Sequence, residues 1–237
     1  MKLVSLNIEM NRHNRAVLDF LKQKPDVICL QELLEEDVSL FKKELGLDVI
    51  FQACRHERKA SGCVGKKIGV AIFAKNITAR GSIFYIGEEQ DVLRPFDSEH
   101  FEKSEALVWA TVQDAHGIAY TFVTAHLPVT TNGESTPLQL EELGRFFAKL
   151  DTLGEFVLCG DMNAPRGWET ANRLAKKYKD AIPPEYESSL DPNLFRVKGL
   201  TRMVDYVFTT PRYTATNVRL VDGLSDHMAV VATIHKD

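Results

Sequence analysis

Short apolar runs that end in polar, chemically reactive side chains are the feature that most constrains the fold of this chain. The runs span roughly four to eight residues and are rich in Val, Ile and Phe, which favours β-strands. Such strands are buried, so the polar groups at their ends emerge at the edge of the core, where several together form a pocket. We expect strands at residues 2–8, 26–30, 48–52, 68–75, 106–113, 119–126, 155–159, 203–209, 215–221 and 228–234.

Amphipathic patterns between these runs predict helices at residues 14–23, 36–45, 137–150 and 168–178. Consecutive strands are often joined by turns, as at residues 114–117, which predicts mixed sheets covered by helices rather than a uniform βαβ winding. No repeat or linker divides the chain, so we expect a single domain over residues 1–237. Long loops are expected at residues 53–67, 87–104 and 182–199.

Composition limits the class of protein. A chain of 237 residues that is 44% apolar and 26% charged is not disordered, collagenous or a coiled coil. The net charge of −4 excludes a generally basic nucleic-acid coat but leaves room for a local basic patch. No run approaches the roughly 20 apolar residues of a membrane span, and the first residues do not read as a signal peptide. We therefore expect a cytoplasmic protein that does not contact membranes, and a monomer.

The four cysteines fit a reducing compartment. Cys29 and Cys159 lie in apolar runs and are expected to be buried thiols. Cys54 and Cys63 flank a polar loop, and a disulfide between them is disfavoured in the cytoplasm.

Each polar residue at a strand end has an ordinary explanation when it is taken alone. Asn163 and Asp161 suit turns, and His126 suits a partly buried, hydrogen-bonded histidine. Asp205 is harder to explain, since a carboxylate inside an apolar strand is unfavourable unless it is paired or hydrogen-bonded.

Taken together, these residues indicate metal-assisted chemistry. The carboxylates and amides are hard oxygen donors, which suit Mg²⁺ or Mn²⁺ rather than a structural zinc. Two histidines and a buried aspartate add proton handling, and the combination fits hydrolysis of a phosphate ester. The oxygen donors are Asn7, Glu9, Glu32, Asp161, Asn163 and Asp226, and the other groups are His126, Asp205 and His227.

In order and spacing, these segments resemble the motifs of the endonuclease/exonuclease/phosphatase superfamily. The matching segments are Asn7, Gln31-Glu32, Thr124-Ala125-His126-Leu127, Gly160-Asp161-Met162-Asn163, Asp205-Tyr206-Val207-Phe208 and Ser225-Asp226-His227, and the resemblance extends over residues 3–234. It implies an α/β fold, a four-layer α/β/β/α sandwich of two mixed sheets flanked by helices.

The resemblance also implies roles for the metal-site residues. Glu32 is expected to be the principal ligand of Mg²⁺, with Asn7 beside it. Asp226 is expected to bind or tune the metal, and Glu9 stands where one branch of the superfamily has an aspartate near it.

The remaining implied roles concern the reacting groups. Asp161 would position and deprotonate the attacking water, and Asn163 would hold the phosphate or Asp161. His227 would donate to a phosphoryl oxygen while Asp205 orients it, and His126 would be a second donor.

His126 distinguishes between branches of the superfamily. The abasic-site endonuclease branch usually has an aromatic residue there, so the chain resembles more closely the deoxyribonuclease-like branch with a histidine after the middle strand. Deoxyribonucleases support that histidine with a glutamate on a middle strand, but residues 66–70 contain no carboxylate. The partner of His126 therefore stays open.

Basic residues near the predicted site suggest contacts to substrate phosphates. The candidates are Arg58, Lys66, Lys67, Lys103, Arg166 and Arg202. Trp168 follows Asn163 closely, and we expect a core tryptophan at a helix start rather than a base-stacking one.

We expect a Mg²⁺-dependent phosphodiesterase acting on nucleic acid, DNA or RNA. A phosphatase of a small phosphorylated metabolite or inositol phosphate is the second hypothesis, and a catalytically silent binding module on the same fold is the third.

Overall fold

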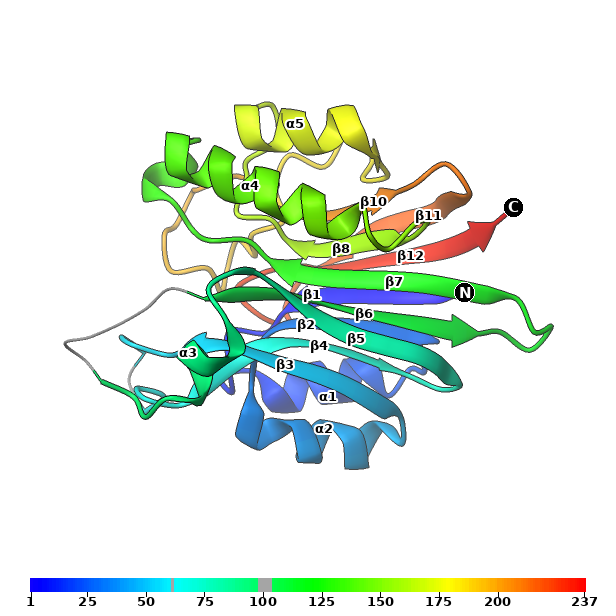
Figure 1. The fold of residues 1–237 in the computed structure, drawn as a ribbon, viewed down its shortest axis with the longest axis horizontal. Coiled ribbons are helices and arrows are strands. Elements are labelled where there is room, and N and C mark those ends of the chain that lie inside the picture. Colours follow the sequence, from blue (N-terminus) through cyan, green and yellow to red (C-terminus); the bar gives the residue numbers. More distant parts are fainter. Residues whose placement is uncertain (61, 98–103) are drawn as a thin grey trace.

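Two six-stranded sheets form the centre of the protein in a computed structural model that describes residues 1–60, 62–97 and 104–237 (Figure 1). Sheet A has the order β11-β12-β1-β2-β4-β3, and sheet B has the order β5-β6-β7-β8-β10-β9. Sheet A contains β1 (Lys2–Asn7), β2 (Val27–Leu34), β3 (Asp48–His56), β4 (Lys67–Ala74), β11 (Tyr213–Val221) and β12 (Ala229–Lys236). Sheet B contains β5 (Ile77–Ile86), β6 (Glu105–Gln113), β7 (Ala119–His126), β8 (Val157–Asp161), β9 (Lys179–Asp180) and β10 (Asp205–Thr209).

Both sheets are mixed. The pairs β1–β2 and β7–β8 are parallel, and their other neighbours pair antiparallel. Because parallel neighbours end at the same edge, β1, β2, β7 and β8 bring the ends of four buried strands to one edge of the sandwich.

Helices cover the outer faces of the two sheets (Figure 1). Val17 and Phe41, on the two helices drawn below the sheets in Figure 1, pack on sheet A. Phe146 and Leu174, on the two helices drawn above the sheets, join the core that includes sheet B. The helices are α1 (Asn14–Leu21), α2 (Val38–Leu45), α3 (Glu89–Leu93), α4 (Pro137–Leu150) and α5 (Glu169–Lys177), with short 3₁₀ turns at Glu35–Asp37 and Thr131–Gly133. The predicted four-layer α/β sandwich is confirmed.

The core between the sheets follows the alternation of the strands. Leu3 and Cys29 of sheet A share it with Val108 and Cys159 of sheet B, and the thiols of Cys29 and Cys159 contact each other there. All four cysteines are free, including Cys54 and Cys63. Among the described residues, no helix has the length and apolar character that crossing a bilayer requires.

Three expectations about local structure were wrong. Residues 77–86 form the edge strand β5, which we did not predict. The expected loop at residues 53–67 is shorter, because β3 continues to His56 and β4 begins at Lys67. Helix α3 lies within the expected loop at residues 87–104, whose residues 98–103 lie outside the described part.

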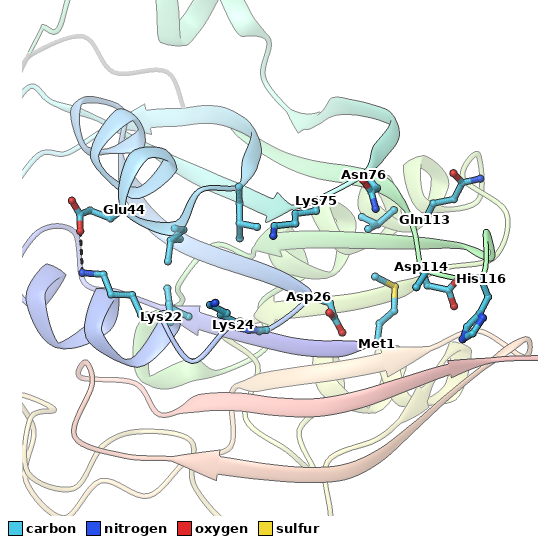
Figure 2. A pocket seen from close by; sticks show the side chains of 16 residues that line it. Met1, Lys22, Lys24, Asp26, Glu44, Lys75, Asn76, Gln113, Asp114 and His116 are labelled. Atoms are coloured by element: carbon cyan, nitrogen blue, oxygen red, sulfur yellow. Dashed lines mark hydrogen bonds and ion pairs between the residues drawn. The ribbon is translucent and has the colours of Figure 1, made fainter.

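A pocket of about 650 Å³ opens at the end of the sandwich where β1 and β2 begin (Figure 2). Its lining includes Lys22, Lys24, Asp26, Lys75 and His116. None of the polar residues predicted at strand ends lines it, so the predicted chemistry belongs to the opposite edge of the sheets.

Gly160 is required for the close approach of β7 and β8. Its φ is +139°, and a Cβ there would lie 2.1 Å from the carbonyl oxygen of Ala125. We expect Gly160→Ala to lower the free energy of unfolding by about 3 kcal/mol or more, measured by urea denaturation. Gly144→Ala is the matched control, because Gly144 lies in α4 with nothing near its absent Cβ, and it should raise stability by about 0.5–1 kcal/mol. An unchanged urea midpoint for Gly160→Ala would contradict this view of the strand pair.

Candidate active site

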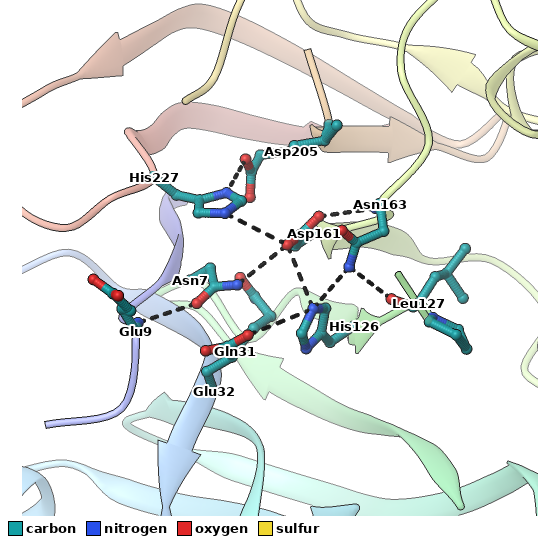
Figure 3. Close-up of polar contacts among 12 residues, drawn as sticks. Asn7, Glu9, Gln31, Glu32, His126, Leu127, Asp161, Asn163, Asp205 and His227 are labelled. Atoms are coloured by element: carbon teal, nitrogen blue, oxygen red, sulfur yellow. Dashed lines mark hydrogen bonds and ion pairs between the residues drawn. The ribbon is translucent and has the colours of Figure 1, made fainter. Parts of the chain in front are cut away.

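Strand register places three of the predicted residues side by side on sheet B. His126 at the end of β7 lies opposite Asp161 at the end of β8, and Asp161 lies opposite Asp205 at the start of β10. Residues directly opposite each other project from the same face of a sheet. That face is turned toward sheet A, because Asp161 contacts a side chain of β1 (Figure 3).

Sheet A supplies two amides to the same edge. Asn7 at the end of β1 lies opposite Gln31 of β2, and its Nδ2 donates to Asp161 Oδ2 at 3.1 Å. Gln31 is fully buried, and its Nε2 donates to Thr124 Oγ1 on sheet B at 2.9 Å. These two hydrogen bonds join the sheets. The sequence predicted no role for Gln31, although an amide directly before Glu32 at a strand end is an available signal.

The Asp161 carboxylate is the centre of this group. It is 1% exposed, its Oδ2 lies 3.4 Å from His126 Nε2 and 3.8 Å from His227 Nε2, and its Oδ1 accepts the Asn163 N–H at 2.8 Å. Burial alone would raise the pKa of Asp161, but His227, His126 and the Asn163 N–H together lower it to about 2. Asp161 is therefore ionised at neutral pH and accepts hydrogen bonds.

His227 is held by a buried chain of polar groups. Its Nδ1 lies 2.7 Å from Asp205 Oδ2, and the same oxygen accepts the Ser189 hydroxyl at 2.6 Å. Burial opposes the charge on His227, but Asp205 and Asp161 raise its pKa well above the usual value. His227 is therefore an imidazolium whose Nε2–H faces the site. Ser189 was missed by the sequence analysis, because nothing near it in its loop distinguishes it.

His126 has two carboxylates within reach of one ring nitrogen. Its Nε2 lies 3.4 Å from Asp161 Oδ2 and 3.9 Å from Glu32 Oε1. Burial lowers the pKa of His126, and Asp161 outweighs that effect, so the pKa is raised. Asn163 Nδ2 lies 2.9 Å from the same nitrogen and donates to the Leu127 carbonyl oxygen at 2.8 Å.

Three of the predicted site residues have a strained backbone. Glu9, Glu32 and Asn163 have φ values of 48°, 58° and 46°, in the left-handed region that residues with side chains seldom adopt. Glu32 lies in an irregularity of the β2–β4 pairing between Leu30 and Leu33. Strained residues of this kind cluster at functional sites.

Three carboxylates crowd together beside the histidines. Burial raises the pKa of Asp226 to about 6, and the nearby charges of Glu9 and Glu32 add to this effect against the opposing charge of His227. The carboxylate of Glu9 also contacts Arg12 Nη1 at 2.5 Å and His13 Nε2 at 3.1 Å. Crowded carboxylate oxygens are the kind of donor set that fits a hard divalent cation.

Asp161, Asp205 and His227 also have the spacing of a metal site, since one atom of each lies within 4.8 Å of the others. His227 Nδ1, however, is already hydrogen-bonded to Asp205. The cluster around Glu32 and Asp226 therefore offers the better oxygen donors for a cation.

The predicted substrate-binding residues are distributed differently. Lys66 and Lys67 form ion pairs with Glu36 at 2.6 Å and Glu35 at 3.7 Å. Arg166 turns to Asp180 at 2.9 Å and to the carbonyl oxygens of residues 182, 183 and 186. Arg58 is exposed in the loop after β3, and Lys103 lies outside the described residues.

Arg55 is a basic residue at this edge that our candidate set did not include. Its Nη1 lies 2.8 and 3.1 Å from the two carboxylate oxygens of Glu105. Burial opposes its charge, but Glu105 and then Glu32 raise the pKa of Arg55 above the usual range. Arg55 therefore adds positive charge on the Glu32 side of the site.

Comparison with known proteins identifies the family. The model of the Endonuclease/Exonuclease/phosphatase family matches residues 4–227. The chain belongs to this family. Its members are phosphoric ester hydrolases, and they generally depend on a divalent metal, so the protein is a phosphoric ester hydrolase. No curated protein matches the sequence.

Several solved structures share the fold of this protein at low sequence identity. A functionally unknown conserved protein from Enterococcus faecalis V583 has a TM-score of 0.75 at 16% identity, with 100% of both chains covered. The human Nocturnin catalytic domain with bound sulfate has a TM-score of 0.72 at 16% identity, covering 100% of this chain and 93% of that one. A Bacteroides thetaiotaomicron VPI-5482 mannosyl-6-phosphatase has a TM-score of 0.69 at 16% identity, covering 99% of each chain.

The raised pKa of Asp226 leads to a prediction for the stability of the metal-free protein. Because the folded protein binds this proton more tightly than the unfolded chain, stability falls as pH rises from about 4 to about 6. Asp226→Asn should therefore stabilise the protein in EDTA at pH 8, by on the order of 1–2 kcal/mol. The gain in Tm should disappear below pH 4. The exposed Asp222→Asn is the control and should change Tm little, and a lower Tm for Asp226→Asn at pH 8 would refute the crowding of carboxylates.

Proposed function

We propose that this protein is a Mg²⁺- or Mn²⁺-dependent phosphodiesterase that hydrolyses nucleic acid by attack of water on phosphorus. The observation that carries the proposal is the buried, ionised Asp161 between two imidazoles. An acceptor for a proton of water and two donors for phosphoryl oxygens then lie within one hydrogen-bonded group, as hydrolysis of a phosphate ester requires.

Each group has a distinct proposed role. Asp161 Oδ2 accepts the hydrogen bond of the attacking water and takes up its proton as the water oxygen bonds to phosphorus, while Asn7 fixes the carboxylate. The P–O bond to the leaving group breaks, and the leaving oxygen takes a proton from solvent. His227 Nε2–H donates to the phosphoryl oxygen on which negative charge develops, and Asp205 and Ser189 keep the imidazolium charged and oriented. His126 and Asn163 bind a second phosphoryl oxygen.

Glu32 is the proposed principal metal ligand, with Asn7 and Asp226 as further ligands and Glu9 close by. When bound, the cation supplies positive charge that stabilises the phosphoryl group during the reaction. The carboxylates themselves hold this charge at the edge where β1 and β2 end.

The charges of the protein support a weak and local interaction with nucleic acid. The net charge of −4 is unsuited to tight, indiscriminate binding of duplex DNA. Lys66 and Lys67 form ion pairs with Glu36 and Glu35. Arg58, which is exposed in the loop after β3, and Arg202 are the proposed contacts to flanking phosphates.

Metal dependence and substrate class are tested together. The purified protein should hydrolyse bis-p-nitrophenyl phosphate and a fluorescent oligonucleotide faster than a panel of sugar and inositol phosphates. EDTA should stop the reaction, and excess Mg²⁺ or Mn²⁺ should restore it. Preference for a phosphomonoester would replace this proposal with the phosphatase, and no turnover of any phosphoester would favour the silent binding module.

Single substitutions test the proposed roles. Asp161→Asn and His227→Ala should each lower kcat on bis-p-nitrophenyl phosphate at least about 100-fold, because each removes a group that handles a proton or stabilises charge. His116→Ala is the matched control, since His116 is exposed in the hairpin at the opposite end of the sheets. Wild-type rates for Asp161→Asn or His227→Ala, with intact folding by circular dichroism, would rule out the assignment.

A further inference from the structure

An indole and a guanidinium form a cation–π contact at the start of α5. Arg202 Cζ lies 5.5 Å from the centre of the Trp168 ring. The prediction that Trp168 is a core residue was wrong, because its exposed fraction is 38%. An exposed aromatic surface beside a cation is therefore present on the protein.

Three loops bring this pair beside the catalytic strands. A Cβ on Gly133 would lie 2.8 Å from Pro165 Cγ and 3.0 Å from Arg202 Nη1, so the segments that carry these residues are in close contact. The segment with Gly133 follows β7, the segment with Pro165 follows β8, and the segment with Arg202 leads into β10. Those strands carry His126, Asp161 and Asp205 at the same ends, and Pro165 is two residues after Asn163. The Trp168–Arg202 pair therefore adjoins the site.

The charge of Arg202 is available to a ligand. Among residues 1–60, 62–97 and 104–237, no carboxylate forms an ion pair with Arg202, whereas Arg166 is paired with Asp180. The backbone of Arg202 is fixed, because its carbonyl oxygen accepts the Ser189 N–H at 2.9 Å and its N–H donates to Ser188 Oγ at 3.2 Å. A positioned guanidinium without an internal acceptor can bind a phosphate.

We propose that Trp168 and Arg202 form a subsite for a nucleobase and the phosphate next to the scissile one. The base stacks on the exposed surface of the pair, and the guanidinium donates to the phosphate. Every base has a flat face, so the subsite tolerates any sequence, but it requires a base that is free to leave its neighbours. The favoured substrate is thus single-stranded nucleic acid. This inference rests on the proposed phosphodiesterase function.

Kinetics on two substrates separate the subsite from the chemistry, because bis-p-nitrophenyl phosphate has no base. Trp168→Ala should lower the ratio of kcat/KM for a single-stranded oligonucleotide to that for bis-p-nitrophenyl phosphate about 10- to 100-fold, and Trp168→Phe should lower it much less. Arg202→Gln should lower the same ratio and reduce the salt dependence of oligonucleotide binding by about one phosphate contact. Arg173→Gln, on the exposed face of α5, is the control for charge and should leave the ratio unchanged.

Fluorescence tests binding without turnover. The chain has two tryptophans, Trp109 on β6 and Trp168, so Trp109→Phe leaves Trp168 as the single reporter. In EDTA, adenosine 5′-monophosphate should quench this emission, whereas ribose 5-phosphate, which lacks the base, should not. Trp168→Phe, which retains Trp109, should give no response to either compound.

The outcomes are distinguishable. Hydrolysis of bis-p-nitrophenyl phosphate with an unchanged ratio in Trp168→Ala and no base-dependent quenching overturns the subsite and leaves the phosphodiesterase function standing. Equal kcat/KM for a duplex and a single strand of the same sequence overturns the preference for unpaired bases. If the wild-type protein hydrolyses no phosphodiester, the proposed phosphodiesterase function itself is overturned.

Discussion

A carboxylate buried between two sheets is the constraint on which the rest of this structure depends. Asp161 is 1% exposed and ionised, and an isolated charge in that position would strongly destabilise the fold. The compensation comes from both sheets: His227, next to β12, and the amide of Asn7 from the side of sheet A, and His126 and the Asn163 N–H from segments of sheet B. Packing of the two sheets against each other is therefore needed to complete the set of partners of this carboxylate.

The same edge accumulates unfavourable features that the rest of the fold offsets. Glu9 and Glu32 adopt left-handed backbone conformations, and Asp226 is crowded by other carboxylates. Elsewhere the sandwich is ordinary, with an apolar interior and helices on both outer faces. Backbone strain and repulsion between like charges are expected at an edge whose residues have been selected for binding a cation rather than for the stability of the metal-free protein.

The sequence predicted the fold well where strands are buried and poorly where they are not. Buried strands such as β2 and β7 are continuous apolar runs, and the polar residues at their ends could be found by inspection. Strand β5 was missed because it is a largely exposed edge strand interrupted by Arg80 and Gly81. Ser189 and Arg55 were missed for another reason: their partners are 16 and 50 residues away, so their importance exists only in three dimensions. Exposure of Trp168 likewise depends on how the loops meet.

His126, Asp161 and Asp205 lie side by side on three neighbouring strands, so the contacts among them depend on the correct pairing of these strands. Side chains alternate between the two faces of a strand, so a slip of β8 by one residue would turn Asp161 away from its neighbours while leaving most backbone hydrogen bonds possible. A misaligned molecule would also have to bury an unpaired charge in the outer layer beneath α4 and α5. Correct alignment is thereby favoured by the same ionised group that is proposed to accept a proton.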